Sequence, residues 1–267
     1  MEYKLPYEWI EERVKPERQR RNDHGNFTLR SPLPERWWQY GEKRPALYHA
    51  IGRSYHFEKH PKGWKPTKNQ MERVLVCSKV TKYLSFAFVP VDWIFSHALA
   101  VFAKASSDVF AFLSSFVNDI WARKNASHLE NRLRYTPSDV FETLPLPGLS
   151  DSALAALGEK SNSLRGKICV DENIGLTSVY NRLHRPDDKD ARIEALRELS
   201  RDIDLAVAAA YGWDDLDIGH GFHDVPYLPE NDRVRFTISE PARIEVLRRL
   251  SELNRQRYNE EVEKGAN

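Results

Sequence analysis

Residues 73–89 read RVLVCSKVTKYLSFAFV. Two apolar runs, 73–78 and 83–89, are rich in β-branched and aromatic side chains, and a polar stretch separates them. Such runs are typical of β-strands. Shorter runs of the same kind follow at 93–95 and 98–102. The stretch and its continuation therefore predict a small, mostly antiparallel sheet.

Helices are expected to pack on this sheet. A short helix is predicted at 46–51, ahead of a polar loop at 52–70. Residues 107–123 carry apolar side chains at three- and four-residue spacing, which predicts one helix with a broad apolar face. Ser107 or Asp108 is the expected N-cap of this helix. The stretch 125–147 has the composition of a loop with some strand character.

The C-terminal part is expected to be mainly helical, with helices at 151–172, 189–211 and 240–263 and a short strand at 233–238. Asp190 and Ser239 are suited to open the second and third helices, and Gly212 to close the second. The proline-rich stretch LPLPGLSD predicts a boundary near Pro147. The fold class is therefore α+β. A basic linker or arm is expected at 1–35, a sheet-and-helix domain at 36–147 and a helical domain at 148–267.

The formal net charge of +1 conceals two halves of opposite sign. Residues 1–147 hold 23 Lys and Arg against 16 Asp and Glu, whereas residues 148–267 hold 17 against 23. A basic half next to an acidic half favours contact of the first with a polyanion. Ordinary scatter of charge is the alternative interpretation.

Composition also indicates where the protein works. The two cysteines, Cys77 and Cys169, cannot form a disulfide framework and do not make a CxxC pair. The N-terminus lacks the apolar stretch of a signal peptide, and no apolar run approaches the roughly 20 residues that span a bilayer. These features predict a cytoplasmic protein with no membrane contact.

Motifs for catalysis are missing from the sequence. It contains no GxGxxG, no GxxxxGK[ST] and no Pro-Pro dipeptide, which the base-holding motif of DNA amino-methyltransferases would require. Two short matches to a nuclease pattern, Glu2-Tyr3-Lys4 and Asp187-Asp188-Lys189, are common by chance. The pairs His56/His60 and His220/His223 are expected to be surface histidines. We therefore predict no catalytic residue, no metal site and no cofactor in this chain.

Two segments combine cations, hydroxyls and aromatic rings at the ends of predicted elements. Lysine and arginine bind phosphates and guanine edges, and serine and threonine serve either kind of contact. A solvated hairpin turn and an ordinary helix end are the alternative interpretation. The candidate DNA-binding residues are Ser78, Lys79, Thr81, Lys82 and Tyr83 in the first segment, and Arg123, Lys124, Arg132, Arg134 and Tyr135 in the second.

Several segments also resemble a known family. The stretches 36–48 (RWWQYGEKRPALY), 73–89 and 133–145 (LRYTPSDVFETLP) are similar to the target-recognition domain of MmeI-like restriction–methyltransferases. Methyltransferases of the DISARM and BREX phage-defence systems share similar segments. The stretch 173–184 (NIGLTSVYNRLH) resembles the helical C-terminal region of the same proteins. The resemblance covers residues 36–260, and RYTPSD-FETLP is its most specific part.

The resemblance implies a role in reading DNA. In that family a separate N-terminal module binds S-adenosylmethionine and methylates adenine N6, while the target-recognition domain reads the major groove and the adenine is flipped out. By position, Lys79, Thr81 and Lys82 resemble base-reading positions, and Arg123, Lys124, Arg132 and Arg134 a second DNA-facing stretch. Tyr40, Lys43 and Arg44 are weaker candidates for backbone contact, and their neighbours Trp37 and Trp38 are expected in the core.

The main hypothesis is thus a double-stranded-DNA recognition module that serves an adenine methyltransferase and lacks the catalytic module. S-adenosylmethionine is expected on a catalytic partner or on a missing module. A subunit, a split gene product, a remnant and a fragment all fit this hypothesis. The alternative is a protein-interaction module whose acidic helical half docks a methyltransferase or defence subunit. A third possibility is an enzyme with an unrecognised site.

Overall fold

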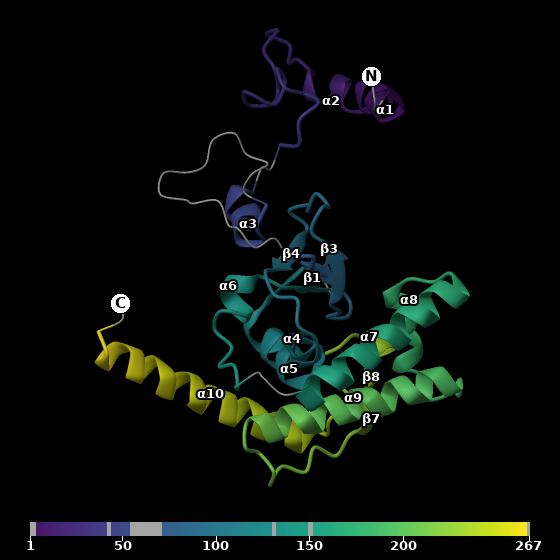
Figure 1. Ribbon diagram of the computed structural model, residues 1–267, viewed down its shortest axis with the longest axis vertical. Coiled ribbons are helices and arrows are strands. Elements are labelled where there is room, and N and C mark those ends of the chain that lie inside the picture. The colour runs from purple at the N-terminus through teal and green to yellow at the C-terminus, as the bar shows by residue number, and fades with distance from the viewer. Residues whose placement is uncertain (1–3, 42–43, 54–70, 130–131, 149–151, 266–267) are drawn as a thin grey trace.

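The computed structural model describes residues 4–41, 44–53, 71–129, 132–148 and 152–265. It has the expected α+β composition, with short antiparallel sheets and long helices (Figure 1). The first sheet has the order β3-β1-β4 and is antiparallel throughout. Its strands are β1 (Arg73–Ser78), β3 (Ala87–Pro90) and β4 (Leu99–Phe102).

Strand β1 is the central strand of this sheet, and both of its faces are covered. Val74 and Val76 face a small cluster around α3 (Pro45–Ala50), which contributes Tyr48. Leu75 and Cys77 face the main core. Side chains alternate between the faces of a strand, so a strand that is covered on both sides has an unbroken apolar sequence, as the run VLVC does.

Two strand predictions are wrong in extent. Residues 93–95 form no strand. Trp93 is 55% exposed, and Phe95 is the residue of these three that is buried in the cluster around α3. The second run, 83–89, is extended but joins the sheet only from Ala87 onward. Its first part, 83–86, leaves the sheet plane, and Phe86 packs edge-to-face on Phe102 in the core.

The helix predicted at 107–123 is divided into α4 (Ser107–Ser114) and α5 (Phe116–Asn125). Ser115 has an extended backbone and donates its hydroxyl to the Phe112 carbonyl. The N-cap position of α4 is Ser106, which corrects the cap expected at Ser107 or Asp108. The apolar spacing is preserved across the break, so the sequence pattern alone does not reveal it.

A second small sheet follows α5. It has the order β2-β6-β5 and consists of β2 (Val80–Thr81), β6 (Arg132–Arg134) and β5 (Ser127–Leu129). Val80 pairs with Arg134, and Ser127 lies opposite Arg134 on the other side. One helical turn, α6 (Pro137–Val140), comes next. The expected strand character of 125–147 is therefore confirmed.

The C-terminal helices agree closely with prediction. They are α7 (Ser152–Glu172), α9 (Ala191–Ala210) and α10 (Glu240–Glu263). The expected caps are confirmed, because Asp190 accepts from the Arg192 N–H and Ser239 from the Ala242 N–H. Gly212 has φ +72°, which suits glycine at a helix end. The prediction missed α8 (Leu176–Leu183) and β7 (Gly221–Asp224), which pairs with β8 (Val234–Thr237).

One core runs through both halves of the chain. Leu75, Phe112, Leu154 and Leu250 belong to the same buried cluster, so residues on each side of the expected boundary at Pro147 pack together. Helix α7 lies along α4, and Gly158 of α7 packs closely against the Ser107 carbonyl of α4. The 36–147 and 148–267 segments are thus not separate packing units.

The segment expected as a linker, 1–35, contains α1 (Lys4–Arg13) and α2 (Lys15–Arg18) and lies at the top of Figure 1, away from the main body. Helix α1 has no buried residue. Lys15 lies 4.9 Å from the ring centre of Trp37, which is buried as expected. Trp38 is 50% exposed, so its expected core position is wrong. No helix in the described part of the chain is long and apolar enough to cross a bilayer.

Candidate nucleic-acid interface

The exposed side of the β2-β6-β5 sheet presents arginine side chains. Arg132 and Arg134 alternate with buried Leu133 along β6, so both arginines lie on the solvent side while the leucine anchors the strand in the core. Neither arginine has a side-chain hydrogen bond or ion pair with any described residue. Two unpaired cations on one rigid strand are suited to bind an extended polyanion.

Lys79 lies where β1 passes into β2, and its backbone is fixed on both sides. Its N–H donates to the Ala98 carbonyl at 2.8 Å, and its carbonyl accepts from the Tyr135 N–H at 2.7 Å. Its ammonium group has no ion-pair partner in the described ranges. Around it, the exposed Ser78 donates to the Val80 carbonyl and Thr81 to the Tyr83 carbonyl. The turn thus holds Lys79 rigidly beside the β6 arginines.

Lys82 and Tyr83 instead connect the two halves of the chain. The Lys82 ammonium lies 3.0 Å from Asp232 and 3.0 Å from the Asn181 side-chain oxygen. Tyr83 is 6% exposed, and its hydroxyl donates to Asn181 and accepts from Arg235. The sequence interpretation grouped both residues with Lys79 as DNA contacts. The pairing of both residues, and the burial of Tyr83, indicate that they hold the C-terminal half against the first sheets.

The second predicted segment is also divided by the structure. Tyr135 is 0% exposed and packs against Phe86 and Phe102, so a DNA contact by its side chain is ruled out. Arg123 is bound to Asp119 at 2.7 Å and faces the interior cavity described below. Lys124 donates to the Ser251 hydroxyl of α10. Among the predicted contacts of this segment, Arg132 and Arg134 are the exposed cations with no side-chain partner in the described part of the chain.

The weaker candidates lie near the start of α3. Arg44 adopts a left-handed backbone with φ 42° and donates to the Ser96 carbonyl, which gives it a structural contact. Tyr40 is 40% exposed. Lys43 lies outside the described residues.

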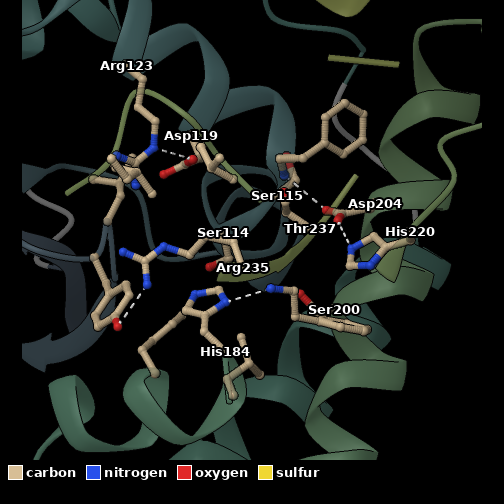
Figure 2. A pocket seen from close by; sticks show the side chains of 18 of the residues that line it. Ser114, Ser115, Asp119, Arg123, His184, Ser200, Asp204, His220, Arg235 and Thr237 are labelled. Carbon is tan, nitrogen blue, oxygen red and sulfur yellow. Dashed lines mark hydrogen bonds and ion pairs between the residues drawn. The ribbon is translucent and has the colours of Figure 1, made fainter. Parts of the chain in front are cut away.

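Sequence reasoning missed a polar cavity between the two halves (Figure 2). The α4–α5 junction, the residue after α8, helix α9 and the β7-β8 hairpin all contribute to its walls. His220 was expected at the surface, but its side chain is 2% exposed and its Nε2 lies 2.8 Å from Asp204. Burial raises the pKa of the Asp204 carboxyl, and the hydrogen bond from His220 opposes that shift. Asp204 also accepts the Phe116 N–H at the start of α5.

His184 lies on another wall of the cavity, and its Nδ1 accepts the Phe236 N–H at 3.1 Å. Burial lowers the pKa of this imidazole well below 6.5, and the nearby Arg235 and Arg123 cations lower it further. No cluster of three or more metal-ligating side chains occurs among the described residues. The Asp187-Asp188-Lys189 match to a nuclease pattern has a structural explanation, because Asp188 pairs with Arg182 at 2.7 Å.

The depressed pKa of His184 predicts how stability depends on pH. The unfolded chain binds a proton at this side chain more tightly than the folded chain, so the stabilisation is present above about pH 6.5 and is lost as the pH falls. As the pH is lowered below 6, the unfolding free energy of wild type should fall more steeply than that of His184→Asn. The difference between the two slopes should be up to about 1.4 kcal/mol per pH unit. Urea unfolding at several pH values measures this difference, and parallel curves would contradict the assignment.

Comparison with known proteins finds similarity in the part of the chain that holds the stretches 36–48, 73–89 and 133–145. Residues 39–148 match the family model described as "MmeI, target recognition domain". No curated protein sequence matches the chain. The solved structure of the Type IIL restriction-modification enzyme MmeI in complex with DNA is similar at 21% identity and a TM-score of 0.48, over 69% of this chain and 21% of that chain. This chain thus spans about a fifth of that enzyme's length. Residues 39–148 are therefore similar to the MmeI target recognition domain, and the chain continues beyond them into a helical region.

Proposed function

We propose that this chain recognises double-stranded DNA through the exposed face of the β2-β6-β5 sheet and the adjoining Lys79. The observation that carries the proposal is the match of residues 39–148 to a target recognition domain, together with three cations in that segment that have no side-chain partner among the described residues. These cations are Lys79, Arg132 and Arg134. The buried Leu133 and the fixed Lys79 backbone hold them in place without help from DNA.

The spacing of the arginines suits a nucleic acid. Two residues along a strand span about 6.6 Å, and side chains at that spacing point to the same face. Both guanidinium groups can therefore face the backbone of one DNA strand, whose phosphates follow one another at every base step. Arginine binds both phosphate oxygens and the guanine O6/N7 edge bidentately. The neighbouring Ser127 and Ser78 are exposed and able to make further polar contacts.

A methyltransferase partner completes this proposal. Methylation would be carried out by another polypeptide or by another region of a longer protein, where S-adenosylmethionine would bind. The chain would then supply the DNA sequence preference of a restriction-modification or phage-defence complex in the cytoplasm. The lack of a base-holding motif in the sequence supports this division of labour.

Substituting the unpaired cations should weaken DNA binding without unfolding the protein. Lys79→Ala and Arg134→Ala should each lower affinity for duplex DNA by about 5- to 100-fold, in the range expected for loss of one charged contact. If the lost contact is to a phosphate, the slope of log K against log salt should also fall by about 1. Fluorescence anisotropy at several salt concentrations measures both effects.

Lys167→Ala is the matched control, because this exposed lysine lies on α7 in the acidic half. It should leave both affinity and salt slope unchanged. Lys82→Ala should lower stability through its lost contacts with Asp232 and Asn181. Equal affinities for wild type, Lys79→Ala and Arg134→Ala would refute the assigned surface.

Helix α10 favours the alternative of a protein-docking role. Its buried residues, Ala242, Val246 and Leu250, all lie in its first half. In its second half Tyr258 is 63% exposed and Val262 is 44% exposed, and the helix extends beyond the body in Figure 1. A gel shift against a random duplex pool at two salt concentrations separates the two roles, because a pure docking module would retain no duplex at either concentration.

A further inference from the structure

The cavity between the two halves has an unusual set of walls (Figure 2). It measures about 100 Å³, well above the roughly 15 Å³ that a single water needs. Figure 2 shows the guanidinium groups of Arg123 and Arg235 on one side and the Asp204–His220 pair on the other. The residues come from both sides of Pro147, so the cavity exists only when the two halves are packed together.

Three lining residues have a buried polar atom with no hydrogen-bond partner among the residues that the structure describes. These atoms are the Ser114 Oγ, the Arg235 Nε and the His220 Nδ1. The side chains of Arg235 and His220 are 6% and 2% exposed, so bulk solvent does not compensate for the missing bonds. Buried polar atoms without a partner are rare because each is costly. Three such atoms around one cavity indicate that a polar occupant belongs there.

Arg123 adds free donors to the same cavity. Its Nε donates to Asp119, but its two terminal nitrogens have no hydrogen-bond partner in the part of the chain described. The side chain is 15% exposed and lines the cavity. A guanidinium group with both terminal nitrogens free presents the fork that binds two oxygens of one oxyanion.

The charges around the cavity agree with an anionic occupant. After burial, the main causes that lower the pKa of His184 are the cations of Arg235, Arg123 and Lys82. These groups therefore create a positive potential at the cavity wall. Asp232 is already bound by Arg235 and Lys82, and Asp204 by His220 and the Phe116 N–H. Asp119 also lines the cavity and is bound by the Arg123 Nε. The unused hydrogen-bonding capacity on the arginine side thus consists mainly of donors.

We propose that this cavity is a binding site for an oxyanion of phosphate size, held by the Arg123 fork, the Arg235 Nε–H and the Ser114 hydroxyl. The anion is either a free phosphate-like ion or a phosphate group of a nucleic acid, and both present the same oxygens to these donors. His220 Nδ1 on the opposite wall offers a contact for the rest of a larger ligand. Ordered water alone is the competing occupant.

Binding of inorganic phosphate to the whole chain tests this proposal. Isothermal titration at constant ionic strength, with chloride as the balancing anion, should show one saturable site. Ser114→Ala should weaken phosphate binding about fivefold. Arg123→Lys keeps the charge but removes the fork, and should weaken it about tenfold or more. Arg248→Lys on the exposed face of α10 should not alter it.

Thermal unfolding of each variant in chloride verifies that it is folded. No saturable phosphate binding by folded wild type would overturn the proposal and leave water as the occupant. Equal phosphate affinity in wild type, Ser114→Ala and Arg123→Lys would also overturn it, because the anion would then lie elsewhere.

A second arm of the experiment identifies the source of the anion. Competition between a short DNA duplex and phosphate, with weaker duplex binding by Ser114→Ala, would assign the site to a nucleic-acid phosphate. Unchanged phosphate binding in the presence of duplex would assign it to a free ion. Either result supports the oxyanion site. The phosphate arm contains no DNA, so its outcome is independent of the proposed DNA-binding function.

Discussion

Replacing Arg197 with alanine is expected to lower the unfolding free energy by about 3 kcal/mol, because four backbone carbonyls, that of the buried Leu183 among them, lose their partner at once. The Arg197 side chain is 3% exposed and belongs to α9. Its guanidinium group donates to four backbone carbonyls at and beyond the end of α8, those of Arg182, Leu183, Arg185 and Asp188. It donates in addition to the Glu194 carboxylate.

Those carbonyls belong to the groups that a helix end leaves unpaired. Arg197→Lys should recover only part of the loss, because an ammonium group cannot match the planar donor pattern. Arg201→Ala, one turn later on the exposed side of α9, is the matched control and should change stability by no more than about 0.5 kcal/mol. Urea unfolding measures all three. A loss for Arg197→Ala as small as that for Arg201→Ala would contradict this role.

Gly158→Ala is the second substitution with a large expected effect. A Cβ at Gly158 would lie 2.1 Å from the Ser107 carbonyl oxygen and 3.1 Å from the Ala111 Cβ. The nearest atom is backbone, so α4 and α7 must move apart in the middle of the shared core. We expect a loss of about 1–3 kcal/mol, the cost typical of an overpacked core.

Gly166 is a matched control on the same helix. It is exposed, and a Cβ there would meet no atom within 4 Å. Gly166→Ala should stabilise the protein by up to about 1 kcal/mol through higher helix propensity. Thermal or urea unfolding measures both changes in stability. A loss for Gly158→Ala and a gain for Gly166→Ala would show that the loss arises from the contact between α4 and α7. Similar gains for both would contradict the close approach of α4 and α7.

Much of the fold could be predicted because the relevant signals are local. Strand β1 is a short apolar run, and Asp190 and Ser239 mark helix starts by the hydrogen bonds their own side chains accept. The break at Ser115 could not be predicted in this way, because the apolar spacing continues across it. Helix α8 was missed although its signal is local, because its buried residues Val179 and Leu183 lie four residues apart.

The candidate site shows the same limit more clearly. Composition marks Lys79 and Lys82 as equivalent, since both are cations in one polar turn. Their difference arises from Asp232 and Asn181, which are remote in sequence and bind Lys82 but not Lys79. The same holds for His220, whose buried partner Asp204 lies on a different element. Charge pattern therefore identifies the basic region, but only the packing shows which cations are free.

The central claim is that this chain by itself recognises DNA. The most direct test is to incubate the purified chain with a random duplex pool and sequence the fraction that it retains at low and moderate salt. Our account predicts that one short sequence motif is enriched, that affinity falls as salt rises, and that Lys79→Ala or Arg134→Ala weakens or changes the enrichment. A chain that retains no duplex, or retains duplexes without any enriched motif, would contradict the account.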